Sequence, residues 1–129
     1  MIEGDVQNTI RIEGAKIKLI LWRNNNGALQ DVHGRLVRYG LGNDSTATNK
    51  LRKSSDLVGI WNGTFVSIEC KASDWRNPWA EGSRRKPTDR ETAQKAWIDI
   101  VTREGGLACF ATCWADVEEA IRVWRLYRS

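Results

Sequence analysis

The pair Asn62-Gly63 stands between two short runs in which apolar and polar residues alternate or nearly alternate. Such a pair between strand-like runs is the strongest short-range signal for a two-residue type I′ turn, which fixes how the two strands pair. The predicted hairpin therefore has a defined register. Its opposed pairs are Trp61 with Thr64, Ile60 with Phe65, Gly59 with Val66, Val58 with Ser67, Leu57 with Ile68 and Asp56 with Glu69.

This register brings two carboxylates together at the open end of the hairpin. Directly opposed side chains in an antiparallel ladder point to the same side, with Cβ atoms about 4.5 to 5.5 Å apart. Asp56 and Glu69 would repel each other by a few tenths of a kcal/mol to about 1 kcal/mol in water, and more in a dry site. A hard divalent cation such as Mg²⁺ would offset the repulsion, since carboxylates, water and phosphate oxygens are its usual ligands.

Lys71 lies two residues beyond Glu69, so it shares that face of the strand. It could polarise a nucleophilic water or stabilise charge on a transferring phosphoryl group. Two simpler readings stay open at this point. Asp56, Glu69 and Lys71 could form an ordinary solvated polar face, and a β-bulge in either strand would break the pairing.

The chain length and composition limit what surrounds the hairpin. With 129 residues, 41% of them hydrophobic, we expect one domain over 1–129. No segment has the length of a membrane span or the pattern of a secretory signal, which favours a cytoplasmic protein. Cys70, Cys109 and Cys113 form no CxxC pair and His33 is the single histidine, so we expect reduced thiols rather than a zinc site. The net charge of +4 fits a polyanionic partner but does not require one.

The first half of the chain predicts a short helix, a strand and a loop. Val6 and Ile10, with Ile12 behind them, predict a helix over 3–15. Residues 17–24 read as a buried strand that stops at turn-forming asparagines. We expect 29–40 to add one more strand and 41–53 to be a loop.

The second half predicts a long loop, two helices and a strand. Residues 72–87 hold prolines, glycine and a basic run, which favours a loop. Thr88 and Glu91 have capping-box spacing before a helix over 88–104, followed by an apolar strand at 107–112 and a closing helix over 116–127. In the helix over 88–104, Gln94 lies at the end of the apolar stripe that should pack on the sheet. It could also be an ordinary polar residue of a first helical turn. The order predicts an α/β fold with a mixed central sheet flanked by helices.

Short motifs follow one another in a specific order from Glu3 to Val117. They are Glu3 with Gln7, Trp22-Arg23-Asn24-Asn25 and Gly27, Ser55-Asp56-Leu57-Val58-Gly59, Glu69-Cys70-Lys71, Thr92 and Gln94 ahead of Trp97-Ile98, Gly105-Gly106, and Asp116-Val117. In this combination they resemble the VRR-NUC domains, a branch of the PD-(D/E)XK nuclease superfamily. The resemblance implies a restriction-endonuclease-like core.

The resemblance also implies a Mg²⁺- or Mn²⁺-dependent phosphodiesterase acting on DNA. The implied metal ligands are Asp56, Glu69 and the main-chain carbonyl of Cys70, and the implied catalytic residues are Asp56, Glu69, Lys71, Gln94 and Glu3. The chain departs from the superfamily at Ser55, where a proline is usual, and at Cys70, where an aliphatic residue is usual. Since Cys70 should point to the other face of its strand, neither departure removes a ligand.

Small stand-alone members of this family are similar to Holliday-junction resolvases. They act on branched DNA and form homodimers, and many come from phages, so the resemblance implies a bacterial or phage-infected host cell. The candidate DNA-contacting residues are Arg23, Arg52, Lys53, Trp75, Arg84, Arg85 and Lys86. Cations there would neutralise phosphates, although the loop with Trp75, Trp79 and the basic run could also be a mobile basic surface loop.

Two other functions compete with a structure-selective endonuclease. One is a less selective nuclease, or a restriction-like subunit that takes its specificity from a partner. The other is a DNA-binding or junction-organising module without chemistry. A purely binding protein has no chemical reason to hold Asp56, Glu69, Lys71 and Gln94 together, which favours an enzyme.

Overall fold

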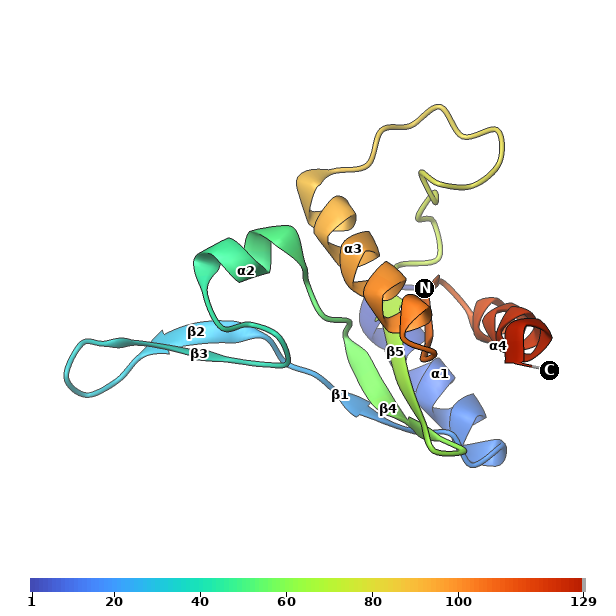
Figure 1. The fold of residues 1–129 in the computed structure, drawn as a ribbon, viewed down its shortest axis with the longest axis horizontal. Coiled ribbons are helices and arrows are strands. Elements are labelled where there is room, and N and C mark those ends of the chain that lie inside the picture. The colour runs from blue at the N-terminus through green and yellow to red at the C-terminus, as the bar shows by residue number, and fades with distance from the viewer. Residues whose placement is uncertain (129) are drawn as a thin grey trace.

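The computed structural model describes residues 1–128, which form a mixed α/β structure (Figure 1). A four-stranded sheet has the order β1-β4-β5-β6, with β6 parallel to β5 and the other neighbours antiparallel, and β2 pairs with β3 in a separate hairpin. The elements are α1 (Glu3–Lys16), β1 (Ile20–Arg23), β2 (Gly27–Gln30), β3 (Leu36–Tyr39), α2 (Thr46–Leu51), β4 (Leu57–Trp61), β5 (Thr64–Cys70), α3 (Asp89–Arg103), β6 (Leu107–Ala111) and α4 (Trp114–Arg128).

The hairpin of β4 and β5 has the predicted register. Asn62 and Gly63 have φ values of 50° and 73°, as a type I′ turn requires of both central residues. The pairs run from Trp61 opposite Thr64 to Leu57 opposite Ile68, without a bulge. The alternative of a β-bulge that breaks the pairing is therefore excluded within β4 and β5.

The first strand differs from its prediction. Residues 17–24 were expected to form a buried strand, but β1 is four residues long and lies at the edge of the sheet, where only Leu21 is buried. An edge strand covered on one face buries only alternate side chains, so its apolar run leaves Ile20 and Trp22 exposed. Its backbone approaches β4 so closely that a Cβ on Gly59 would lie 1.8 Å from the carbonyl oxygen of Ile20.

Helices cover both faces of the sheet, as predicted. Figure 1 shows α3 in front of the sheet and α1 behind it. Side chains of α1 and α4 share the main core with one face of β4 and β5; the core residues are Val6, Ile10, Leu19, Leu21, Leu57, Trp61, Val66, Ile68, Cys70, Leu107, Ala111, Val117 and Ile121. Ile12, expected beside Val6 and Ile10, is exposed.

The opposite face of β5 contacts α3. Trp97 donates from Nε1 to the hydroxyl of Ser67 at 2.9 Å, and Ser67 alternates along β5 with the core residues Val66 and Ile68. The helix begins at the predicted capping box, in which Thr88 and Glu91 satisfy each other's backbone N–H groups. Glu69 and Lys71, two and four residues beyond Ser67, therefore point to the α3 side.

The segment from 29 to 53 is more structured than predicted. The expected single strand over 29–40 is two strands, because the side chain of Asp31 accepts from the N–H groups of His33 and Arg35 at 2.8 and 2.9 Å and turns the chain back. The expected loop over 41–53 contains α2, whose N-cap Ser45 accepts from Thr48 N. The hairpin of β2 and β3, which we call the arm, projects beyond the sheet (Figure 1).

The remaining predictions of secondary structure hold. Residues 71–88 contain turns but no helix or strand, and α3, β6 and α4 occur within a few residues of their expected bounds. Within residues 1–128, no helix combines the length and the hydropathy needed to cross a membrane.

Candidate metal centre

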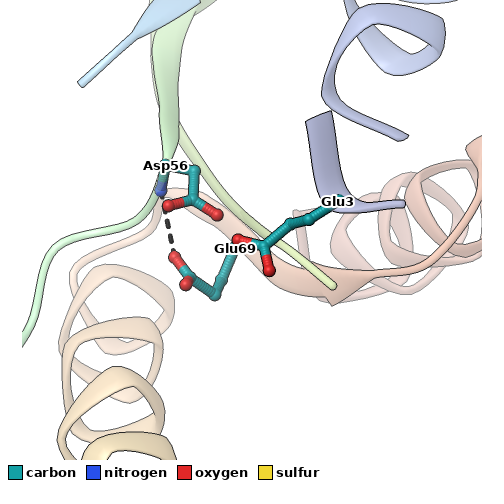
Figure 2. Close-up of side chains that lie close together, drawn as sticks. All are labelled: Glu3, Asp56 and Glu69. Atoms are coloured by element: carbon teal, nitrogen blue, oxygen red, sulfur yellow. Dashed lines mark hydrogen bonds between the residues drawn. The ribbon is translucent and has the colours of Figure 1, made fainter. Parts of the chain in front are cut away.

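Three carboxylates from three elements meet at the open end of the β4–β5 hairpin (Figure 2). Asp56 immediately precedes β4, Glu69 is the penultimate residue of β5, and Glu3 opens α1. One carboxylate oxygen of each lies within 4.8 Å of the others. Glu69 is only 2% exposed, Asp56 is half-buried and Glu3 is exposed, so the cluster leads from the interior to the surface.

The main chain of the hairpin fixes the two inner carboxylates. The N–H of Asp56 donates to Oε2 of Glu69 at 3.0 Å, and the N–H of Cys70 donates to Oδ2 of Asp56 at 3.3 Å. Each strand thus holds the carboxylate of the other. The last ladder pair of the hairpin is Leu57 with Ile68. Just beyond it, these two bonds hold Asp56 opposite Glu69, as the register predicted.

The outer carboxylate is held by the packing of the chain start. Ile2 caps α1, and Ser73 donates from its backbone N–H and its hydroxyl to the carbonyl oxygen of Met1, at 3.0 and 3.2 Å. Since Ser73 follows β5 by three residues, this contact places Glu3 beside the end of that strand.

Burial and mutual repulsion disfavour negative charge in this cluster. Burial, and then the charge of Glu3, raise the pKa of Asp56 to about 6. Burial, and then the charge of Asp56, raise the pKa of Glu69 to about 8, although Lys71 opposes the shift. The single positive charge of Lys71 therefore does not offset the burial and mutual repulsion of the three carboxylates.

A buried amide connects the carboxylates to Lys71. Gln94, on the first turns of α3, is 2% exposed; it donates from Nε2 to Oε1 of Glu69 at 2.6 Å and accepts from Nζ of Lys71 at 2.8 Å. Nζ also lies 5.7 Å from the ring centroid of Trp75 and 5.8 Å from that of Phe110, within range of a cation–π contact. Gln94 thus orients both the acid and the cation.

This donor set fits a hard divalent cation. Clustered carboxylate oxygens are ligands for such ions, and a bound cation would relieve the repulsion that raises both pKa values. Nothing in the set distinguishes Mg²⁺ from Mn²⁺. The thiol of Cys70 points into the core on the other side of β5, as predicted, and burial raises its pKa, so it offers no soft ligand.

The predicted DNA-contacting residues fall into two groups. Trp75 and Arg85 have partners within the chain, since both bind Glu91: Trp75 donates from Nε1 to Oε2 at 2.7 Å, and Arg85 forms an ion pair with the same oxygen at 2.7 Å. These bonds hold the pKa of Glu91 well below its usual range and anchor the 71–88 loop to α3. The alternative of a mobile loop is not supported at these two residues.

The other predicted contacts are more accessible. Arg23, Arg52, Arg84 and Lys86 are exposed, with Arg23 donating to Oδ1 of Asn8 at 3.1 Å. Lys53 alone of the predicted set lines the cleft that opens beside Asp56 and Glu69.

That cleft, of about 760 Å³, is the part of the site that sequence reasoning missed. Its walls are the arm, α2 and the start of α3, and its additional polar residues are Asn24, Asn25, Asn26, Arg38, Tyr39, Asn43, Asn49, Ser54 and Arg90. The run of asparagines from 24 to 26 was the available signal, but it was interpreted as a turn and, in part, as a motif of the family resemblance, and not as the wall of a cleft. Asn24 in fact donates to Ser54 Oγ at 2.8 Å and to the carbonyl of Ser55 at 2.9 Å, next to Asp56.

Compared with protein-family models, with curated proteins and with solved structures, the chain gives no significant match to any of them.

Proposed function

We propose that this chain is a Mg²⁺- or Mn²⁺-dependent endonuclease that hydrolyses phosphodiester bonds in branched DNA such as four-way junctions. The observation that carries the proposal is the cluster of Glu3, Asp56 and Glu69, joined through Gln94 to Lys71. The resemblance of its motifs to the VRR-NUC branch of the PD-(D/E)XK nucleases supports the same chemistry and a restriction-endonuclease-like core.

In this proposal, Asp56 and Glu69 hold the metal, with the main-chain carbonyl of Cys70 as a further ligand and Glu3 at the exposed side. The metal, when bound, would supply Lewis-acid activation of water and charge stabilisation at phosphate oxygens. Lys71 lies at the same end of β5, and its ammonium group stabilises negative charge developing on the phosphoryl oxygens. Gln94 is a positioning residue, because it holds the Lys71 ammonium group and the Glu69 carboxylate in one arrangement.

The net reaction consumes one water. Its oxygen forms a bond to phosphorus while the bond from phosphorus to one sugar oxygen breaks, and one proton of the water ends on the released sugar oxygen. Selectivity for branched DNA and a homodimeric state come from the family resemblance. A dimer suits a four-way junction, because two symmetric cuts require two sites related by a two-fold axis.

The test is incubation of the purified chain with four-way, flap and linear duplex DNA, each with Mg²⁺, with Mn²⁺ and with a chelator. We expect metal-dependent cleavage that favours the four-way junction. Asp56→Ala and Glu69→Ala should abolish cleavage and leave DNA binding largely intact, since phosphate contacts supply the affinity. Lys71→Ala should lower the rate severely without preventing metal binding.

Each outcome separates the competing functions. Equal cleavage of all three DNAs would favour a less selective nuclease or a subunit that depends on a partner. Binding of DNA without cleavage under any metal would favour a module without chemistry. Unchanged cleavage by Asp56→Ala or Glu69→Ala would disprove the assigned metal centre.

A further inference from the structure

The cleft beside the carboxylates carries cations from three separate elements. Arg38 is on β3 of the arm, Lys53 follows α2, and Arg90 is on the first turn of α3. Asp56 and Glu69 line the same cleft. The cleft therefore has carboxylates and cations on its walls, and a phosphate group that coordinates a divalent cation would complement both.

None of these three cations is neutralised within residues 1–128. Arg38 donates to Oδ1 of Asn43 at 3.3 Å and to the hydroxyl of Thr46, and Lys53 donates to Oδ1 of Asn49, but no carboxylate lies within ion-pair distance of Arg38, Lys53 or Arg90. The partners of Arg38 and Lys53 are neutral oxygens. The charges are therefore left available to a ligand.

Two of the cations also repel each other. Burial, and then the positive charge of Arg90, lower the pKa of Lys53. Like charges held close together favour an anion between them, as opposite charges attract most strongly where water is partly excluded. By contrast, Arg85 at the base of the neighbouring loop is paired with Glu91.

Hydrogen bonds join the walls of the cleft. Asn43 donates from Nδ2 to the carbonyl oxygens of Gly27 and Tyr39, both at 2.9 Å, which joins the arm to the segment before α2. On the other wall, the N–H of Lys53 donates to the carbonyl of Ala93 on α3 at 3.0 Å. These bonds hold the segments that carry Arg38 and Lys53 in place beside α3.

We propose that this cleft binds the sugar–phosphate backbone of a nucleic-acid strand on one side of the reacting phosphate, with Arg38, Lys53 and Arg90 contacting phosphates. Arginine and lysine are the usual partners of phosphate oxygens, and such contacts position a strand without reading its sequence. The placement of the reacting phosphate rests on the proposed function, whereas binding of the backbone does not require cleavage. A mononucleotide or inorganic phosphate would present the same chemistry, so the experiment includes both.

The experiment measures binding of a fluorescently labelled four-way junction and of a linear duplex by anisotropy, in a chelator and over a series of salt concentrations. The test variants are Lys53→Gln and Arg90→Gln. The matched controls are Lys50→Gln, on α2 but outside the cleft lining, and Arg103→Gln, at the far end of α3. Thermal unfolding and circular dichroism of every variant confirm that the fold is retained.

Each test variant should bind DNA about three- to tenfold more weakly, with the slope of log affinity against log salt reduced by about one. The controls should match the wild type. Inorganic phosphate or a nucleoside monophosphate, at the same phosphate concentration as the DNA, should not displace it. Displacement by either would overturn the backbone assignment in favour of a small-anion site.

The result separates this inference from the proposed function. If the wild type cleaves DNA but Lys53→Gln and Arg90→Gln bind it like the controls, the cleft is not the strand-binding site. If the test variants lose affinity and slope but no metal supports cleavage, the cleft assignment stands and the nuclease proposal fails. A wild type that neither binds nor cleaves DNA would overturn both.

Discussion

At the scale of single residues, the amide of Gln94 joins a buried carboxylate to a cation. Its two hydrogen bonds, to Glu69 and Lys71, are 2.6 and 2.8 Å long. A buried amide whose donor and acceptor both have partners costs about 1 to 3 kcal/mol when one side is lost. Gln94 therefore has a structural role and, in the proposed reaction, a positioning role, and the two can be separated by experiment.

Gln94→Leu keeps the size of the side chain but cannot bridge Glu69 and Lys71. We expect the free energy of unfolding to fall by about 1 to 3 kcal/mol, because Glu69 loses a buried partner. We also expect kcat for DNA cleavage to fall by at least about tenfold, with the KM for DNA little changed, because the proposed strand contacts are made by the cleft cations and not by Gln94. Urea unfolding and steady-state kinetics measure the two effects. Asp99→Asn, on an exposed position of α3, is the control, and an equal loss in both variants would contradict the positioning role.

The raised pKa values of Asp56 and Glu69, about 6 and about 8, predict an unusual pH dependence of stability. In the unfolded chain both carboxyl groups titrate near their ordinary values of about 4. Between about pH 4 and 8 the folded protein therefore binds more protons than the unfolded chain, and its stability falls as pH rises. A bound divalent cation should reverse this trend, because it stabilises the ionised carboxylates.

Thermal unfolding at pH 5, 7 and 8.5, with and without Mg²⁺, checks this dependence. We expect the metal-free midpoint to fall between pH 5 and 8.5, and the rise caused by Mg²⁺ to be largest at pH 8.5. Glu69→Gln should remove most of both effects, whereas Glu119→Gln, on the exposed face of α4, should leave them unchanged. A metal-free midpoint that rises over this range would contradict the raised pKa values.

At the scale of elements, two glycines of the central hairpin have different roles. Gly63 has φ of +73° with no atom within 4 Å of an added Cβ, so only its backbone conformation resists substitution. Gly59 is held against β1, where an added Cβ would lie 1.8 Å from the Ile20 carbonyl oxygen. One glycine therefore allows the turn, and the other allows close approach of the edge strand.

The two glycines predict substitutions of different cost. Gly63→Ala should lower the free energy of unfolding by about 1 to 2 kcal/mol, the cost of left-handed backbone for a residue with a Cβ. Gly59→Ala should cost at least about 3 kcal/mol or detach β1 from β4, because backbone atoms must move. Urea unfolding ranks the variants, and hydrogen exchange of the amides of β1 and β4 tests the detachment. Equal costs, or a larger cost at Gly63, would contradict this assignment.

Local patterns predicted elements well where the deciding interaction was local. The Asn62-Gly63 turn and the Thr88–Glu91 capping box are made by adjacent residues, so both were recognised from the sequence. The helix α2 was missed because its six residues bury no side chain and carry no apolar stripe; its signal was the cap Ser45. The arm was read as one strand because the turn at Asp31 depends on side-chain bonds within a run that is otherwise strand-like.

At the scale of the whole molecule, residue patterns predicted the part of the candidate site that belongs to a single hairpin. Its register brought Asp56, Glu69 and Lys71 together, and the family resemblance added Gln94 and Glu3. The cleft was not predictable, because Arg38 and Arg90 are far apart in the sequence and line one cleft only in the folded chain. No periodicity or spacing in the sequence indicates that they share a cleft.

The proposed symmetric cutting of a four-way junction makes a prediction about the whole assembly. Two active sites must be presented with two-fold symmetry, so we expect a homodimer with twice the single-chain mass of 14.7 kDa.

Sedimentation equilibrium at the concentrations used for cleavage measures this mass directly. A supercoiled cruciform plasmid provides the functional counterpart, because paired cuts made by a dimer linearise the plasmid within one binding event, whereas independent cuts accumulate nicked circles first. Mixing the wild type with an excess of Glu69→Ala chains should therefore convert linear product into nicked product. A single-chain mass together with unchanged product ratios in the mixture would contradict symmetric cutting, and would leave the metal centre to be judged by its own variants.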